Sequence, residues 1–179
     1  MMSRATTVLT RSLGVLIVTA ALAGCAPTPE PTPTPTGFAS EEEAFAAAEE
    51  TYRAYVDALN DVDLSDPETF EPVYALTTGE ANAGARETFS EYHANGWQVN
   101  GTTIATVIVE LPKGEAFATK LDLAICLDVS DVDVVDPTGD SVVGSDRPPV
   151  QAMTVSMTRG GATWRISEIT GREGPPECT

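Results

Sequence analysis

The apolar positions between residues 40 and 60 recur at the spacing of a helix. They form one stripe, made of Phe45, Ala48, Tyr52, Tyr55, Val56 and Leu59. Such a stripe usually packs into a core. Ser40 is a suitable N-cap, and Glu43 three residues later completes the sequence pattern of a capping box. The pattern therefore predicts a first helix over 40–60.

Two further helices are predicted before residue 97. Asp66 and Pro67 supply an N-cap and a first-turn proline for a short helix that reaches about Leu76. A third helix is predicted over 78–95. We expect it to stop at Gly96, because glycine readily adopts the left-handed conformation that ends helices.

From residue 97 onward β-branched residues replace the helical pattern. The predicted strands cover 99–111, 116–129, 132–135, 141–143, 151–158 and 163–169, with turns at 112–114, 136–140 and 159–161. In the second strand Leu121, Leu123, Ile125 and Leu127 alternate with Lys120, Asp122, Cys126 and Asp128. One buried face is therefore expected, with Asp122 toward water. Helices followed by antiparallel strands predict an α+β domain, with about three N-terminal helices packed on one face of a curved sheet.

The first 24 residues have the pattern of a signal peptide. Arg4 and Arg11 precede an apolar run over 12–24, which ends in Leu22-Ala23-Gly24-Cys25. Small residues before a cysteine suit a bacterial lipobox, so we expect cleavage before Cys25 and lipidation of that cysteine. The alternatives are an ordinary secretory signal with a chance cysteine, or a poor transmembrane anchor. Two or more acyl chains would hold the protein firmly in the membrane.

A proline at every second position between residues 27 and 35 excludes helix and central strand. The segment 25–39 is therefore predicted to be a Pro/Thr-rich tether that begins at the lipidated Cys25. A ligand for a proline-reading domain and a glycosylated stalk are alternatives. The rest of the chain, 40–179, suits a single domain.

The chain is strongly acidic, with 27 acidic against 10 basic residues and a net charge of −17. Removal of the leader takes away two arginines and leaves a net charge of −19. Nucleic acid is therefore excluded as a partner. The acidic residues are spread over the whole domain, as expected for a solvated surface on the outer face of the membrane.

Two cysteines remain once Cys25 carries lipid. Exported proteins meet oxidising conditions, so we expect a disulfide between Cys126 and Cys178 that attaches the tail, residues 171–179, to the sheet. Two free thiols or a metal pair are the alternatives. Closing so long a loop is worth about 3 to 5 kcal/mol.

Candidate chemistry is sparse. His93 near the end of the third helix is expected to satisfy the terminal carbonyls of that helix. Glu168 shares the parity of Trp164 and Ile166, so it is a better candidate than Asp122 for a partly buried carboxylate. A solvated edge, or a salt bridge to Arg165 or Arg159, is the default expectation for Glu168. We assign neither His93 nor Glu168 a catalytic role and keep both as pocket candidates.

Two acidic runs suggest calcium, one with Asp61, Asp63 and Asp66 and the other within 128–136, but their spacing does not fit a calcium loop. We therefore expect these aspartates to serve as caps, turns and solvated edges, and we predict no metal site. The sequence contains no phosphate loop, nucleophile elbow, zinc-protease motif or Cys-x-x-Cys, so no cofactor is predicted.

Three helices followed by a long-stranded antiparallel sheet resemble the nuclear transport factor 2-like fold, a cystatin-like α+β cone. The stretch 55–97, with Asn60 to Pro67 and His93 to Trp97, and the lipobox with its Thr-Pro tether resemble uncharacterised actinobacterial lipoproteins. The resemblance implies a pocket between the sheet and the helices. Members of the wider fold include isomerases, cyclases, hydrolases and non-enzymatic binding modules. Homodimerisation through the sheet is implied because related folds often form it.

We therefore expect a lipid-anchored protein at the extracytoplasmic face of the cell membrane that acts as a binding or interaction module. Its partner would be another envelope protein or a small ligand. The alternative is a small-molecule enzyme of isomerase, cyclase or hydrolase type. An enzyme is expected to enclose a pocket with a buried carboxylate or histidine, whereas an interaction module is expected to have a filled interior and exposed apolar residues.

Overall fold

The computed structural model describes residues 37–111, 119–161 and 163–179. The predicted signal peptide, Cys25, most of the tether and the turn predicted at 112–114 fall outside the described residues. Within the described part of the chain, no helix is both long enough and apolar enough to cross a membrane. All elements described below belong to one unit, Pro35–Thr179.

The first helix begins where the sequence predicts. α1 covers Glu41–Asn60, and the Ser40 hydroxyl accepts a hydrogen bond from the backbone N–H of Glu43 at 3.1 Å. The Glu43 carboxylate accepts in return from the backbone N–H of Ala39 at 2.7 Å, one residue earlier than in the usual capping box. The buried residues of α1 are Ala44, Ala48, Tyr52, Tyr55, Val56 and Ala58.

The second and third predicted helices are also present. Asp66 caps a 3-10 turn, η1 (Pro67–Phe70), and α2 (Glu71–Leu76) follows directly. The single short helix that the sequence predicts is thus a 3-10 turn joined to an α-helix. α3 covers Gly79–Asn95 and ends at Gly96, whose φ of +67° is left-handed as predicted.

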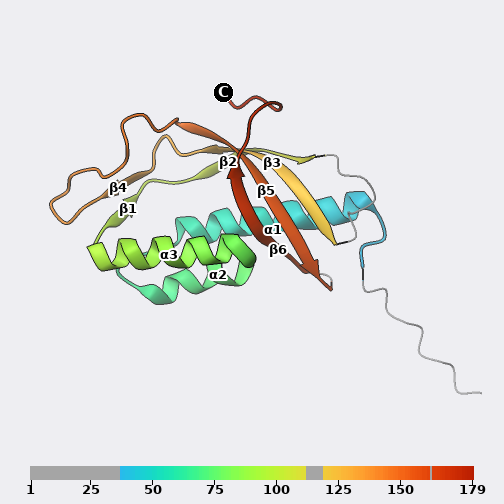
Figure 1. The fold of residues 1–179 in the computed structure, drawn as a ribbon, viewed down its shortest axis with the longest axis horizontal. Helices are drawn as coiled ribbons and strands as arrows, with labels where there is room; N and C mark the ends of the chain where they lie inside the picture. Colours follow the sequence, from blue (N-terminus) through green and yellow to red (C-terminus); the bar gives the residue numbers. More distant parts are fainter. Residues whose placement is uncertain (1–36, 112–118, 162) are drawn as a thin grey trace, which may run out of the picture. The chain divides into compact units, whose positions relative to one another are not determined.

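The strands form two antiparallel sheets. Their bounds are β1 Gln98–Asn100, β2 Ile104–Leu111, β3 Lys120–Asp128, β4 Asp133–Val135, β5 Val150–Gly160 and β6 Thr163–Gly171. The larger sheet has the order β2-β3-β5-β6, and the smaller one pairs β1 with β4. The α+β class, with three helices packed against antiparallel sheet, is confirmed (Figure 1).

The continuous strand predicted over 99–111 is wrong, because this segment contains two strands from different sheets. Gly101 lies between them with a φ of +87°. A Cβ atom at this position would lie 1.9 Å from the backbone oxygen of Asp131. Only glycine therefore lets the chain leave one sheet and enter the other at this point.

The two predicted hairpin turns are present. Asp136 donates its backbone N–H to the carbonyl of Asp140 at 2.9 Å, and its carboxylate accepts from the backbone N–H of Thr138 at 2.8 Å. This turn follows β4 and leads to a bridge at Ser141. β5 and β6 form the other hairpin and pair along most of their length.

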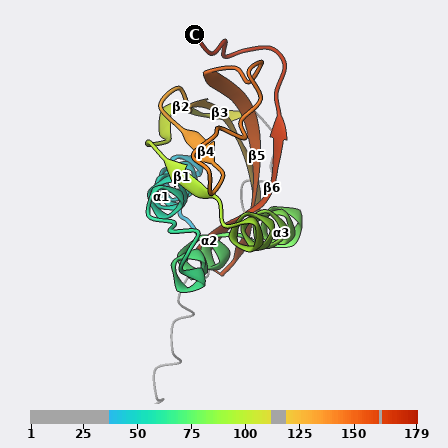
Figure 2. The same cartoon turned by 90° about the vertical axis from the view of Figure 1, so that its left-hand side faces the viewer.

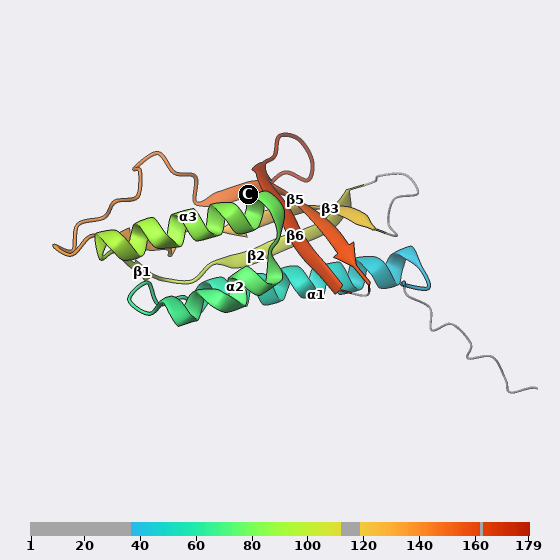
Figure 3. The same cartoon turned by 60° about the horizontal axis from the view of Figure 1, so that its bottom comes forward.

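The helices cover one face of the larger sheet. α1 crosses its strands, and α3 lies beside β6 (Figures 1 and 3). Figure 2 shows the C-terminal tail at the end of the domain away from α2 and α3. The largest fully buried side chains are Trp164, Tyr52, Leu123, Ile125, Met157, Ile166, Val73, Val155 and Cys126.

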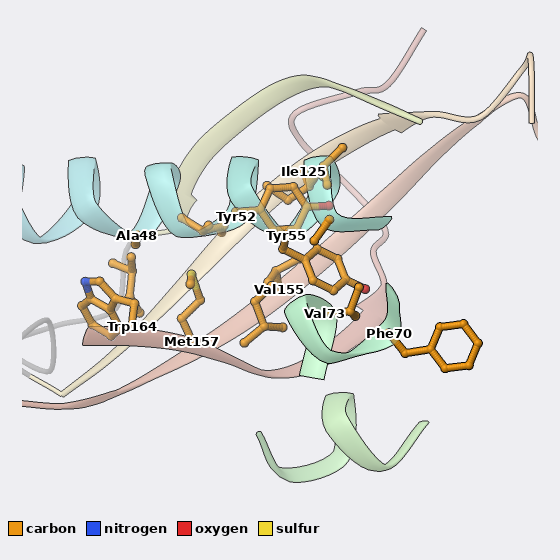
Figure 4. Close-up of a cluster of buried hydrophobic side chains, with 14 of the residues drawn as sticks. Ala48, Tyr52, Tyr55, Phe70, Val73, Ile125, Val155, Met157 and Trp164 are labelled. Carbon is orange, nitrogen blue, oxygen red and sulfur yellow. The ribbon is translucent and has the colours of Figure 1, made fainter. Parts of the chain in front are cut away.

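The space between α1 and the sheet is filled by side chains. Figure 4 shows Tyr52 of α1 above Met157 and Trp164 of the sheet. The indole N–H of Trp164 donates to the carbonyl of Ala44 at 3.0 Å, so the polar atom of this buried ring is satisfied. Phe45 is partly buried against the same cluster.

β3 is buried on both faces, which corrects the expectation of one buried face. Leu123 and Ile125 face the helices, but Ala124 and Cys126 on the other side are also buried. Asp122, which was expected to face water, is only 7% exposed. The physical reason is that Cys126 is covered by the tail through its disulfide with Cys178, while Asp122 lies between its cross-strand neighbours Leu111 and Ser156.

The predicted disulfide between Cys126 and Cys178 is confirmed. The two Cα atoms lie 5.4 Å apart, within the usual range for a disulfide. Arg172 reinforces the attachment, because its guanidinium donates to the carbonyls of Gly174 and Pro176 within the tail. Its backbone N–H donates to the carbonyl of Ala152 at 2.8 Å. The tail is thus held to the face of the sheet opposite the helices.

Candidate functional site

A cleft of about 480 Å³ lies where α1, α3 and β6 meet. Its volume is within the usual range for small-molecule sites. The lining residues are Tyr55, Leu59, Glu80, Ala81, Gly84, Ala85, Thr88, Phe89, Glu168, Ile169 and Thr170. The cleft is separate from the filled interior between α1 and the sheet, so it coexists with a well-packed core.

Small side chains of α3 create this space. Ala81, Gly84, Ala85 and Thr88 recur at helical spacing and line the cleft. A Cβ atom added to Gly84 would meet no heavy atom within 4 Å. Packing therefore does not require a glycine at this position, although glycine within a helix costs about 1 kcal/mol relative to alanine.

The apolar wall of the cleft is rigidly supported. Tyr55 and Phe89 are each 9% exposed. The Phe89 ring packs against the rings of Phe70 and Tyr74, with centroids 5.1 Å and 6.0 Å away. The Tyr55 ring lies 5.9 Å from that of Tyr52, whose side chain is almost completely buried. Aromatic pairs at these distances stabilise each other.

Burial keeps the tyrosine of this wall neutral. It raises the pKa of Tyr55 to about 12, from an ordinary value of 10.0. Burial also raises the pKa of the neighbouring Tyr52, and the proximity of Tyr55 raises it further. At neutral pH Tyr55 therefore offers the cleft an aromatic surface without charge.

The charged residues that line the cleft are both acidic. Glu80 lies in the first turn of α3, and Glu168 lies on β6. No lysine, arginine or histidine is among the described residues that line the cleft. These carboxylates would therefore repel an anionic ligand, whereas they would attract a cationic ligand and would not repel a neutral one.

Glu168 lies at the cleft with an exposed side chain, as expected of a solvated edge and not of a partly buried carboxylate. The pairing of β5 with β6 shifts register between Ser156 and Met157, and Ser167 has no partner in it. Such a bulge reverses the alternation of faces. Ile169 therefore lies on the same apolar face of the sheet as Ile166. Glu168 pairs with Ser156 and lies on the opposite face.

His93 has a structural contact and is not among the residues that line the cleft. Its Nδ1 lies 2.7 Å from the carbonyl oxygen of Leu64, in the loop before η1. The ring also meets Phe70 edge-on. The sequence predicted a contact with the terminal carbonyls of α3, whereas the structure gives His93 a carbonyl partner in a distant loop.

The acidic runs build turns and caps. Asp63 accepts hydrogen bonds from the hydroxyl and backbone N–H of Ser65, at 2.8 and 2.9 Å, and these bonds lower the pKa of Asp63. Asp66 accepts from the backbone N–H of Glu68 at 3.1 Å. Among the described residues, no group of three or more histidine, cysteine, aspartate or glutamate side chains is arranged to hold a metal ion.

The resemblance implied a pocket between the sheet and the helices, and Glu168, kept as a pocket candidate, lines the cleft, but sequence reasoning did not identify Gly84. The available signal was the run of small residues on one face of α3, at positions 81, 84, 85 and 88. That pattern alone does not distinguish a helix that packs closely from one that leaves a space. The distinction depends on how far α3 lies from α1 and β6.

No family model matches the chain, and no curated protein matches it. Among solved structures, the chain is similar to a de novo designed β-sheet protein determined by solution NMR. The identity is 15% and the TM-score 0.36, and the match covers 76% of this chain and 94% of the designed chain. A likeness this low carries no argument about fold or function. The resemblance to the nuclear transport factor 2-like fold and to actinobacterial lipoproteins stays a prediction.

Proposed function

We propose that this chain is a membrane-anchored, extracytoplasmic binding module that holds a small, mainly apolar ligand in the cleft between α1, α3 and β6. The leader that ends at Cys25 supports export and lipid anchoring. The cleft supports the binding of a small molecule, because such sites are mostly apolar with a few polar groups.

The observation that carries the proposal is Gly84. This residue is helical, has open space at its Cβ position, and lies in the wall of the cleft. A larger residue would favour the helix by about 1 kcal/mol, yet it would reduce the space. The absence of a side chain at this position therefore favours an open cleft at the expense of stability, as expected of a binding site.

The wall of the cleft limits the chemistry of the ligand. Phe89, Leu59 and Ile169 offer apolar contact, and Tyr55 is neutral at physiological pH. With only carboxylates as charged lining residues, the site favours a neutral or cationic ligand over an anionic one.

An enzyme that uses this cleft has less support. The two residues kept from the sequence as pocket candidates, Glu168 and His93, do not share the site. Glu168 is exposed, and His93 contacts the carbonyl of Leu64 instead. Catalysis by an acid and a base needs both groups within reach of one substrate.

The proposal is tested by filling the cleft. Gly84→Leu places a side chain in the open space. The control is Ala83→Leu, which introduces the same side chain at the preceding residue of α3, and this residue does not line the cleft. A library of small apolar and cationic compounds is screened by ligand-observed NMR. Compounds that bind the wild type should lose at least about tenfold in affinity with Gly84→Leu and keep it with Ala83→Leu. Equal binding to all three proteins would refute the cleft as the site.

The membrane anchor is tested separately. Cys25→Ser removes the residue that carries the lipid, so the protein should move from the membrane fraction to the soluble exported fraction. Mass spectrometry of the wild type should find the acyl groups on Cys25 at the mature N-terminus. Retention of Cys25→Ser in the membrane at the wild-type level would contradict lipid anchoring.

A further inference from the structure

The larger sheet has one edge that is covered and one that is open. At β6, the backbone N–H of Thr78 donates to the carbonyl of Ile166 at 2.7 Å, and Thr77 forms a parallel bridge with the same strand. At the other edge, no strand or isolated bridge in the described part of the chain pairs with the outer side of β2. An open edge offers unpaired backbone groups to another extended chain.

The register identifies which residues of β2 present these groups. The backbone N–H of Arg159 donates to the carbonyl of Thr119, and that of Val129 donates to the carbonyl of Pro149. Odd-numbered residues of β3 therefore bond to β5, and its even-numbered residues bond to β2. Their partners on β2 are Val107, Val109 and Leu111, paired with Cys126, Ala124 and Asp122. The N–H and C=O groups of Ile108 and Glu110 consequently point away from the sheet.

The side chains along this edge combine apolar and acidic groups. Ile104 is 52% and Val109 is 39% exposed, and both are large apolar residues. Glu110 is half-buried, and Glu41 at the start of α1 lies near enough to interact with it electrostatically. Burial, together with the Glu41 charge, raises the pKa of Glu110. A cation at this place would relieve the repulsion between the two carboxylates.

We propose that the outer edge of β2 binds an extended basic peptide segment of another protein by strand addition. Backbone hydrogen bonds to Ile108 and Glu110 would hold the segment. Lysine or arginine side chains would lie beside Glu110 and Glu41, and alternate apolar side chains would lie beside Val109. This surface is distinct from the cleft, and the inference does not depend on the proposed ligand.

The charge of the chain favours this occupant over a second copy of the same protein. The mature chain carries a net charge of −19, so two copies repel each other. Pairing of two β2 edges would also bring further carboxylates to Glu110 and Glu41. The register shift between Ala105 and Val107 further disturbs the regular edge that a second copy would need.

The test uses the chain from residue 25 onward with Cys25→Ser, so that it stays in solution. The probe is the acetylated and amidated peptide Val-Lys-Val-Lys-Val-Lys, followed by amide NMR and hydrogen exchange. Binding should slow exchange of the Ile108 and Glu110 amides, while the Val107 and Val109 amides, already bonded to β3, should change little.

Two matched peptides and two protein variants separate the contribution of charge from that of backbone hydrogen bonding. Glutamate in place of lysine should abolish binding, and so should N-methylation of the lysine amides, which would face β2 opposite Glu110. Glu110→Gln should weaken the lysine peptide about two- to fivefold. Glu173→Gln in the exposed tail should leave its affinity unchanged.

Three results would overturn the proposal. The first is no change at Ile108 and Glu110 with the lysine peptide at millimolar concentration. The second is equal binding of the N-methylated peptide. The third is protection of these amides without peptide together with a dimer in analytical ultracentrifugation, which would identify a second copy as the occupant.

Discussion

Loss of the disulfide between Cys126 and Cys178 should remove a large part of the stability of this domain. The informative change is Cys178→Ala. It breaks the bond at its half-buried partner and leaves Cys126 as a buried thiol, which packs like a small apolar residue. The alternative, a change at Cys126, would also disturb the interior of β3.

The size of the effect follows from the length of the loop that the disulfide closes. The cysteines are separated by 52 residues. The chain-entropy relation then gives a loss of about 4 kcal/mol in the free energy of unfolding. With a denaturant slope of about 2 kcal/mol/M in urea, the unfolding midpoint should fall by about 2 M.

The assay is equilibrium urea denaturation of the oxidised wild type, the reduced wild type and Cys178→Ala, followed by tryptophan fluorescence. Trp164 reports on the core, because its indole is 1% exposed. The reduced wild type and the variant should unfold at the same urea concentration. A change below about 1 kcal/mol would refute the reasoning, because the unfolded chain would then gain little freedom when the loop opens.

Two further predictions concern α1. Tyr55 has a folded pKa of about 12, above its ordinary value of 10.0. Stability is therefore complete below pH 10 and falls between pH 10 and 12, and Tyr55→Phe should remove about 2 to 3 kcal/mol of that fall in urea denaturation. An unchanged pH dependence would contradict this assignment. Ser40→Ala should cost about 1 kcal/mol because the Glu43 N–H loses its acceptor, while Ser90→Ala on the exposed face of α3 is the control. Equal melting temperatures for the two variants would show that the cap does not contribute.

Features set by nearby residues were predictable from the sequence. The start of α1 at Ser40 and the end of α3 at Gly96 depend on local hydrogen bonds and backbone conformation. The disulfide was predictable because only two cysteines remain after Cys25. Each of these inferences uses residues whose roles follow from their type or their immediate neighbours.

Features set by contacts between distant segments were not predictable. The break at Gly101 arises from its approach to Asp131. The burial of Asp122 depends on its cross-strand neighbours Leu111 and Ser156, which alternation within β3 does not reveal. Parity along β6 could not place Glu168, because the bulge at Ser167 depends on the pairing of two strands.

The size of the cleft and the residues of α3 that line it could not be predicted, for the same reason. Its volume depends on how far α1, α3 and β6 lie from one another, and no single segment encodes that separation. The sequence shows only that α3 carries small residues on one face. That Gly84 borders open space is known only from the structure.

The central claim is that the cleft beside Gly84 holds a ligand. The most direct measurement is native mass spectrometry of the protein purified from the cells that produce it, for the wild type, Gly84→Leu and Ala83→Leu. The account predicts a bound small molecule on the wild type and on Ala83→Leu, and none on Gly84→Leu. The same bound mass on all three proteins, or none on any of them, would contradict it.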